Sequence, residues 1–264
     1  MRQLIAGNWK MNGLAPQLEQ IEAIAASVKA DPPGADVLIC VPATLVARAA
    51  QVAAGRIAIG GENCAAATAG AFTGDVSAEM LAGAGASAVI VGHSERRRLH
   101  GETDANVAAK AKAAWRAGLT TIICIGETGA QRLAGKAQST CAAQIDGSVP
   151  EGMTGAANAI GYEPLWAIGS GRTPDPEEII AMHGYIRQRL ESRLGAEGKL
   201  VRILYGGSVK PANAADILAL AEVGGALVGG ASLEAGEFEA IIRAVPAGRA
   251  PAGDAVRLPA PASG

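Results

Sequence analysis

Short runs of consecutive apolar residues alternate along this chain with longer, alanine-rich segments. A run that is apolar at every position, rather than at every second one, is typical of a parallel strand buried on both faces. The pattern predicts eight such strands: Gln3–Gly7, Asp36–Val41, Arg56–Gly60, Ala88–Gly92, Thr120–Ile125, Ala157–Gly161, Val201–Tyr205 and Ala226–Val228.

Helical periodicity fills much of the sequence between these runs. It predicts helices over Gln17–Lys29, Asn106–Ala117, Glu177–Leu194 and Ala214–Leu220. The third of these has a strong start signal, since Asp175 suits an N-cap and Pro176 suits the first helical position. Gly118 marks the end of the second.

Strand and helix therefore repeat in units of roughly 30 residues, the usual length of a βαβ unit. Parallel strands need such long crossovers, and eight of them can close into a (β/α)8 barrel. An open, doubly wound α/β sheet fits the same alternation, so periodicity alone does not choose between them. We expect one domain over residues 1–245. Residues 246–264 are rich in Pro, Ala and Gly, and we predict a flexible tail there.

Composition narrows the possible partners. The 264 residues carry a formal net charge of −2, which gives no electrostatic footprint for nucleic acid or an anionic membrane. No apolar stretch reaches the length of about 18 residues that a spanning helix needs, and the first residues do not resemble a secretory signal. The four cysteines form no CxxC pair and no Cys/His cluster, which argues against a metal site. We expect reduced thiols and a cytoplasmic protein.

The candidate chemistry lies directly after the apolar runs, because the active site of a parallel barrel is built at the C-terminal ends of its strands. These positions hold Asn8 and Lys10, His93-Ser94-Glu95, Glu163, Gly206-Gly207-Ser208, and Gly229-Gly230-Ala231-Ser232. A lysine, a histidine and a carboxylate from three strand ends would converge on one pocket. The two glycine pairs follow the last two strands, where such barrels hold phosphate with backbone N–H groups.

Each of these residues also has an ordinary explanation when taken singly. Lys10 could be a solvated lysine, His93 a hydrogen-bonded structural histidine and Glu163 a loop carboxylate. Either glycine pair could be a plain turn. Their joint placement at matching strand ends favours a functional site. The other two histidines, His100 and His183, have no motif partner, and we expect both at the surface.

Five segments resemble the motifs of triosephosphate isomerases, in the order and spacing of that family. They are Ala6–Asn12 (AGNWKMN), Val91–Arg97 (VGHSERR), Tyr162–Gly171 (YEPLWAIGSG), Tyr205–Val209 (YGGSV) and Leu227–Leu233 (LVGGASL). The resemblance covers Met1 to about Ala244 and favours the closed (β/α)8 TIM barrel over the open sheet. It implies interconversion of D-glyceraldehyde 3-phosphate and dihydroxyacetone phosphate through an enediolate, with no cofactor and no metal.

The resemblance also implies a role for each matching residue. Glu163 would be the base that moves the proton, His93 a neutral electrophile and Lys10 the positive charge that stabilises the enediolate. Asn8 would hold Lys10 and contact substrate, while Ser94 and Glu95 would support the site. The list of implied phosphate ligands is Gly169, Ser208, Gly229 and Gly230.

Two moving or assembling parts are implied as well. Residues 164–174 resemble the family's lid, which closes over the phosphate and excludes water, with Tyr205 and Ser208 as its latch. Residues 70–75 resemble the loop whose threonine, here Thr73, reaches the active site of a neighbouring subunit. A homodimer is therefore expected.

Five positions depart from the common family pattern: Glu62 (more often glutamine), Gly161 (alanine), Leu165 (valine), Ser170 (threonine) and Gly224 (aspartate). None belongs to the catalytic set. An isomerase of a four-carbon ketose phosphate would share that set and differ only in pocket volume. A non-catalytic scaffold barrel would be expected to lack Lys10, His93 or Glu163. Another phosphate barrel, such as an indole-glycerol-phosphate enzyme, would explain the glycine pairs but not the other motifs.

Overall fold

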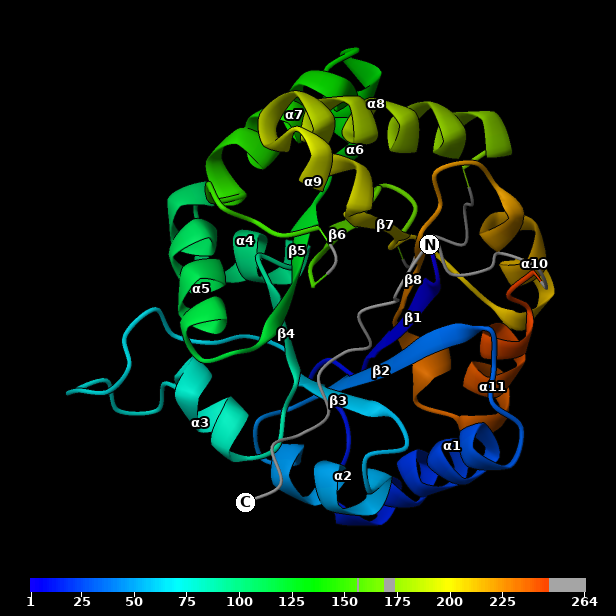
Figure 1. The fold of residues 1–264 in the computed structure, drawn as a ribbon. Helices are drawn as coiled ribbons and strands as arrows, with labels where there is room; N and C mark the ends of the chain where they lie inside the picture. Colours follow the sequence, from blue (N-terminus) through cyan, green and yellow to red (C-terminus); the bar gives the residue numbers. More distant parts are fainter. Residues whose placement is uncertain (156, 169–173, 247–264) are drawn as a thin grey trace.

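Eight parallel strands form a closed barrel with helices around its outside (Figure 1). This is a computed structural model, and it describes residues 1–155, 157–168 and 174–246. The predicted tail, apart from Pro246, lies outside the described residues. Among the described helices, none is both long enough and apolar enough to cross a membrane.

The strands follow one another around the barrel in chain order. They are β1 (Gln3–Asn8), β2 (Ala35–Val41), β3 (Ala58–Gly61), β4 (Ala88–Val91), β5 (Thr120–Ile125), β6 (Ala159–Tyr162), β7 (Arg202–Tyr205) and β8 (Gly225–Val228). β1 pairs with both β2 and β8, in the registers Leu4↔Asp36 and Leu4↔Gly225. That second pairing closes the sheet, so the open doubly wound alternative is wrong and the barrel is confirmed.

The helices are α1 (Leu18–Ala30), α2 (Val46–Ala53), α3 (Ala78–Gly83), α4 (Ser94–His100), α5 (Asp104–Arg116), α6 (Gly129–Leu133), α7 (Ala137–Ser148), α8 (Pro176–Leu194), α9 (Ala196–Leu200), α10 (Pro211–Ala219) and α11 (Ala235–Arg243), with 3-10 turns η1 (Ala15–Gln17) and η2 (Gly230–Ser232). Asp175 caps α8 and Pro176 opens it, as predicted. The predicted start of α10 was three residues late. Pro211 takes the first position, and the Asn213 side chain accepts the Lys210 N–H.

Alternation along each strand divides the apolar residues between two cores. Leu4 and Ala6 of β1 point into the barrel, whereas Ile5 between them packs against the surrounding helices. The same division holds around the barrel, with Ile90 inside and Val89 outside on β4. Both faces of every strand are therefore buried, which is why the strands read as unbroken apolar runs.

The barrel interior is narrow, and glycine makes room where strands press closest. A Cβ on Gly60 would lie 2.7 Å from the Cys40 sulfur, closer than real contacts allow. All four cysteines are buried and free, which agrees with the predicted reduced thiols.

Candidate active site

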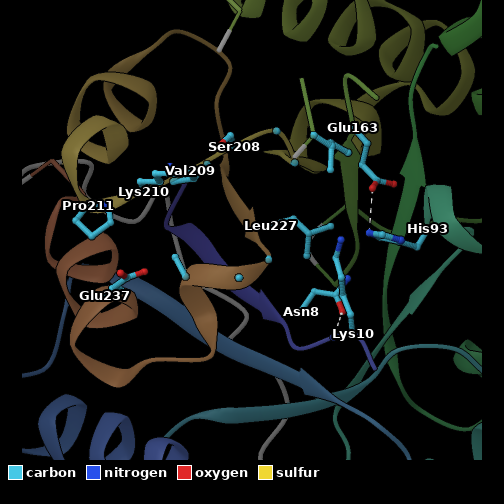
Figure 2. Close-up of a pocket in the computed structure, with 16 residues that line it drawn as sticks. Asn8, Lys10, His93, Glu163, Ser208, Val209, Lys210, Pro211, Leu227 and Glu237 are labelled. Carbon is cyan, nitrogen blue, oxygen red and sulfur yellow. Dashed lines mark hydrogen bonds and ion pairs between the residues drawn. The ribbon is translucent and has the colours of Figure 1, made fainter. Parts of the chain in front are cut away.

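One cavity of about 400 Å³ opens at the C-terminal ends of the strands (Figure 2). Its lining includes predicted site residues from five different strand ends: Asn8, Lys10, His93, Glu163, Ser208, Gly229 and Gly230. The barrel topology explains this convergence, because eight parallel strands bring all their C-terminal ends to one rim.

Lys10 lies just beyond β1, in a conformation that lysine rarely adopts. Its φ is +55°, the left-handed region, and such strain is found mainly where surrounding contacts enforce it. The Asn8 side-chain oxygen accepts the Lys10 N–H at 3.1 Å, and Asn12 donates its N–H to the Lys10 carbonyl at 2.8 Å. The ammonium then reaches Glu95 Oε1 at 2.6 Å. Lys10 is thus fixed at the cavity with a charged partner.

Glu163 follows β6 and is almost completely buried. The Ser94 hydroxyl donates to its Oε1 at 2.8 Å, and the Ser94 N–H donates to its Oε2 at 3.0 Å. His93 Nε2 lies 3.0 Å from the same Oε1, the contact drawn in Figure 2. Three hydrogen-bond donors therefore converge on one buried carboxylate.

Electrostatics keep this carboxylate ionised. Burial on its own would raise the pKa of Glu163, but the attraction of His93 and the hydrogen bonds from His93 and Ser94 outweigh it and lower the pKa below its ordinary value. The Glu95 N–H, at the start of α4, donates to His93 Nδ1 at 3.3 Å. Nδ1 is therefore a hydrogen-bond acceptor, and Nε2 is the ring nitrogen that faces Glu163.

A second group of lining residues, predicted to hold phosphate, comes from the ends of β7 and β8. Ser208 lies in the loop between β7 and α10, and Gly229 and Gly230 lead from β8 into η2. The first N–H groups of a helical turn have no partner within the turn and can face an anion. Gly230 has open space where a Cβ would stand, so a ligand can approach its backbone. Gly169, the remaining predicted phosphate ligand, lies outside the described residues.

The two residues predicted to act with moving or neighbouring segments lie away from the cavity lining. Tyr205, at the end of β7, is fully buried, and its hydroxyl has no hydrogen-bond partner among the described residues. Thr73 is exposed in the long segment between β3 and α3, which projects away from the barrel in Figure 1. Of the predicted lid, residues 164–168 and 174 are described, and residues 169–173 are not.

Sequence reasoning missed Glu127, which follows β5 and has no exposed surface. Its Oε1 accepts the indole N–H of Trp166 at 2.8 Å and the Tyr162 hydroxyl at 3.2 Å. Its backbone carbonyl accepts the Leu165 N–H at 3.1 Å. Glu127 thus ties the first part of the predicted lid to the barrel. Its position two residues past a predicted strand was the signal that could have found it.

His183 corrects a second expectation, because we predicted a surface histidine from the lack of a motif partner. The residue is fully buried on the inner face of α8. Its Nδ1 contacts the Glu222 carbonyl at 3.2 Å, and its ring packs edge-on against Tyr162. Burial lowers the pKa of His183 to about 4, so it stays neutral. His100 is exposed, as expected.

The closed barrel and this site define a class of protein: a (β/α)8-barrel enzyme whose cavity is lined by a lysine, a histidine, a buried carboxylate and glycine-rich strand ends. Among the described residues, no group of three or more His, Cys, Asp or Glu side chains is arranged to hold a metal ion.

Comparison with known proteins identifies the family. Residues 3–245 match the family described as triosephosphate isomerase. The chain is 58% identical to triosephosphate isomerase from Afipia carboxidovorans over 247 residues, covering 93% of this chain and 98% of that protein. It is 58% identical to the same enzyme from Ruegeria pomeroyi, over 92% and 97% of the two chains. The crystal structure of triosephosphate isomerase from Bartonella henselae superposes with a TM-score of 0.87 at 46% identity, covering 92% of this chain and 99% of that one. The chain belongs to the triosephosphate isomerase family.

Proposed function

We propose that this enzyme interconverts D-glyceraldehyde 3-phosphate and dihydroxyacetone phosphate, with Glu163 as the base. The observation that carries the proposal is the shared cavity: the Glu163 carboxylate, whose pKa is lowered, the His93 imidazole and the Lys10 ammonium line the same space as the glycine-rich ends of β7 and β8. The names of the relatives support the same reaction.

The proposed proton chemistry needs an ionised Glu163 and a neutral His93, and the acceptance of the Glu95 N–H by His93 Nδ1 supports it. Glu163 takes a proton from the carbon next to the substrate carbonyl and returns it to the neighbouring carbon. His93 donates its Nε2 proton in a hydrogen bond to the substrate oxygens as negative charge develops on them. Lys10 stabilises that charge electrostatically. Glu163 rests on Ser94 and His93 before substrate arrives, so its side chain turns toward the substrate carbon for the reaction.

Substrate is held by its phosphate, which takes no part in bond breaking. Ser208, Gly229 and Gly230 supply the backbone cradle, and Gly169 completes it when the lid over residues 164–174 closes. Exclusion of water protects the enediolate, which would otherwise eliminate phosphate. Tyr205 latches the closed lid. Its buried hydroxyl without a partner among the described residues supports this role.

The test is turnover of D-glyceraldehyde 3-phosphate with and without Glu163→Gln, and with no metal added. We expect fast turnover by the wild type and a loss of at least about 1,000-fold in kcat for the variant, since the amide cannot accept the proton. The Glu22→Gln variant, on the exposed face of α1, serves as the matched control and should keep full activity. A Glu163→Gln enzyme with wild-type kcat would refute the role of the base.

We also propose that the enzyme is a cytoplasmic homodimer. Four buried free thiols suit a reducing compartment. Apolar side chains exposed in the segments after β1, β3 and β4 suit a subunit interface, in which Thr73 of one subunit would approach the site of its neighbour.

A further inference from the structure

The backbone of Glu163 rests on the end of β5. The Glu163 N–H donates to the Ile125 carbonyl at 2.8 Å, and its own carbonyl lies over the Cα of Gly126. A Cβ on Gly126 would stand 1.8 Å from that carbonyl oxygen, so any other residue here would displace the Glu163 backbone. The Gly126 peptide is thus the platform beneath the proposed base.

A single side chain from the outer helical layer holds this platform. Gln144 Oε1 accepts the Gly126 N–H at 2.7 Å, and Gln144 Nε2 donates to the Gly126 carbonyl at 3.1 Å. Gln144 belongs to α7, which packs beside β5. Its amide therefore satisfies both backbone groups of Gly126 and fixes the orientation of the two peptide groups on either side of its Cα. Gln144 is not among the residues that line the cavity, so its proposed role is indirect.

The same helix holds the neighbouring residue as well. Cys141, one turn before Gln144, lies with its sulfur 3.9 Å from Glu127 Oε2. Glu127 in turn binds Leu165 and Trp166 beyond the base. The end of β5 thus bridges α7 on one side and residues 163–166 on the other.

This arrangement matters because Glu163 must move its side chain without moving its backbone. Its carboxylate has to leave Ser94 and reach a substrate carbon, and it turns about its own Cα as the pivot. A pivot that shifts by about 1 Å can cost roughly 100-fold in rate, because proton transfer requires close alignment. Contacts that fix the pivot therefore contribute to turnover while making no contact with substrate.

We propose that Gln144 is a positioning residue for the base, acting through the Gly126 peptide. This inference rests on the proposed role of Glu163 in the reaction.

The first test compares Gln144→Met and Gln144→Glu with the wild type. Methionine keeps the length of the side chain and removes both hydrogen bonds, so we expect kcat to fall by about 10- to 100-fold with KM changed less than about threefold. Glutamate keeps the oxygen that accepts the Gly126 N–H and loses the donor. The kcat of Gln144→Glu should therefore lie between that of the wild type and that of Gln144→Met. Gln138→Met, an exposed substitution on the same helix, is the matched control and should leave kcat unchanged.

A double-mutant cycle separates positioning from a general loss of structure. In the Glu163→Gln background there is no base to position, so adding Gln144→Met should leave the residual turnover unchanged. An equal further loss in that background, or a normal kcat for Gln144→Met alone, would overturn the inference. Those outcomes leave the role of Glu163 intact, whereas full activity of Glu163→Gln alone would refute the proposed function itself. Thermal melts of each variant show whether it is folded at the assay temperature.

Discussion

The carboxyl group of Glu62 is largely removed from water. The pKa of Glu62 is raised from its ordinary 4.5 to about 8, chiefly by burial and also by repulsion from Glu95. The hydrogen bond from the Lys10 N–H and the charge of Lys10 both lower the pKa, but by less than burial raises it. Its Oε1 is buried with no hydrogen-bond partner among the described residues. Below pH 4.5 the carboxyl is protonated in both the folded and the unfolded chain, so it adds no pH dependence. As the pH rises toward 8 the unfolded chain ionises and the folded one does not, and the free energy of unfolding falls.

We therefore expect Glu62→Gln to stabilise the protein in a pH-dependent way. Glutamine cannot ionise, so the variant escapes the loss of stability that the wild type shows between pH 4.5 and 8. Its melting temperature should exceed that of the wild type by several °C near pH 8, at about 2–4 °C for each kcal/mol, and by much less near pH 5. Calorimetry at one fixed protein concentration measures both. A difference that stays constant across this pH range would contradict the linkage, and Glu22→Gln on α1 should show no such trend.

Removal of the Tyr205 hydroxyl should affect activity without affecting stability. Its hydroxyl is buried without a hydrogen-bond partner among the described residues, so removing it deprives the described fold of no hydrogen bond. Tyr205→Phe should therefore melt at the wild-type temperature or slightly above it, while kcat falls about 10-fold or more if the hydroxyl is the proposed latch of the lid. Steady-state kinetics and thermal melts test the two halves together. A wild-type kcat would remove the latch, and a marked fall in melting temperature would show that the hydroxyl is needed by the open fold.

At the scale of elements, Glu127 connects the end of β5 with residues 164–166, the first part of the predicted lid. Trp166 donates its indole N–H to Glu127 Oε1, and the Arg132 guanidinium lies 4.4 Å from the Trp166 ring centre. Trp166→Phe keeps an aromatic ring for Arg132 but leaves a buried acceptor with one donor fewer. We expect a loss of about 1–3 kcal/mol in the free energy of unfolding, read from the shift of a urea unfolding curve. Glu127→Gln keeps an oxygen for the same donor and should lose less. Equal stability of the Trp166 variant and the wild type would show that this contact does not anchor the lid.

Elements were predictable from the sequence where the physics is local. The strands fell within about two residues of their observed bounds, because burial on both faces leaves an unbroken apolar run. The residues at the strand ends, such as Lys10 and Glu163, could be placed in one pocket because topology alone brings those ends together. Periodicity could not close the barrel, since the pairing of β1 with β8 joins segments more than 200 residues apart.

The contacts that the sequence did not reveal are tertiary ones. His183 looked like a surface residue because no motif surrounds it, yet it occupies the buried stripe of α8 together with Ile179 and Ile186. The sequence shows this stripe as a helical repeat of buried positions, provided that histidine is counted as a residue that can be buried. Gln144 carries no such signal. An amide on an amphipathic helix is ordinary, and only the fold shows that it grips the peptide beneath Glu163.

At the scale of the whole molecule, one set of exposed apolar side chains suggests a surface that binds a partner. Its members are each more than half exposed and lie after β1, after β3 or in the helices that follow β3 and β4: Met11, Leu14, Phe72, Met80 and Leu99. Because these strands belong to one side of the barrel, the segments that follow them share one side of its rim. Soluble monomers seldom leave several large apolar side chains exposed together, and such a patch marks an interaction surface. A second copy of this chain would cover it, as the proposed homodimer requires.

Phe72→Asp tests that assembly within the segment between β3 and α3, which projects from the barrel (Figure 1). A carboxylate at an apolar interface would have to be desolvated without a partner, which costs several kcal/mol and is repeated in each subunit. We expect sedimentation velocity to show a dimer for the wild type and a monomer for the variant at the same concentration. Activity should fall with it, because the monomer would lack the proposed contact of Thr73 with the neighbouring site. Leu133→Asp replaces a side chain that is 92% exposed on α6, outside this patch, and should remain dimeric and active. If the wild type sediments as an active monomer, the patch has another occupant and each barrel works alone.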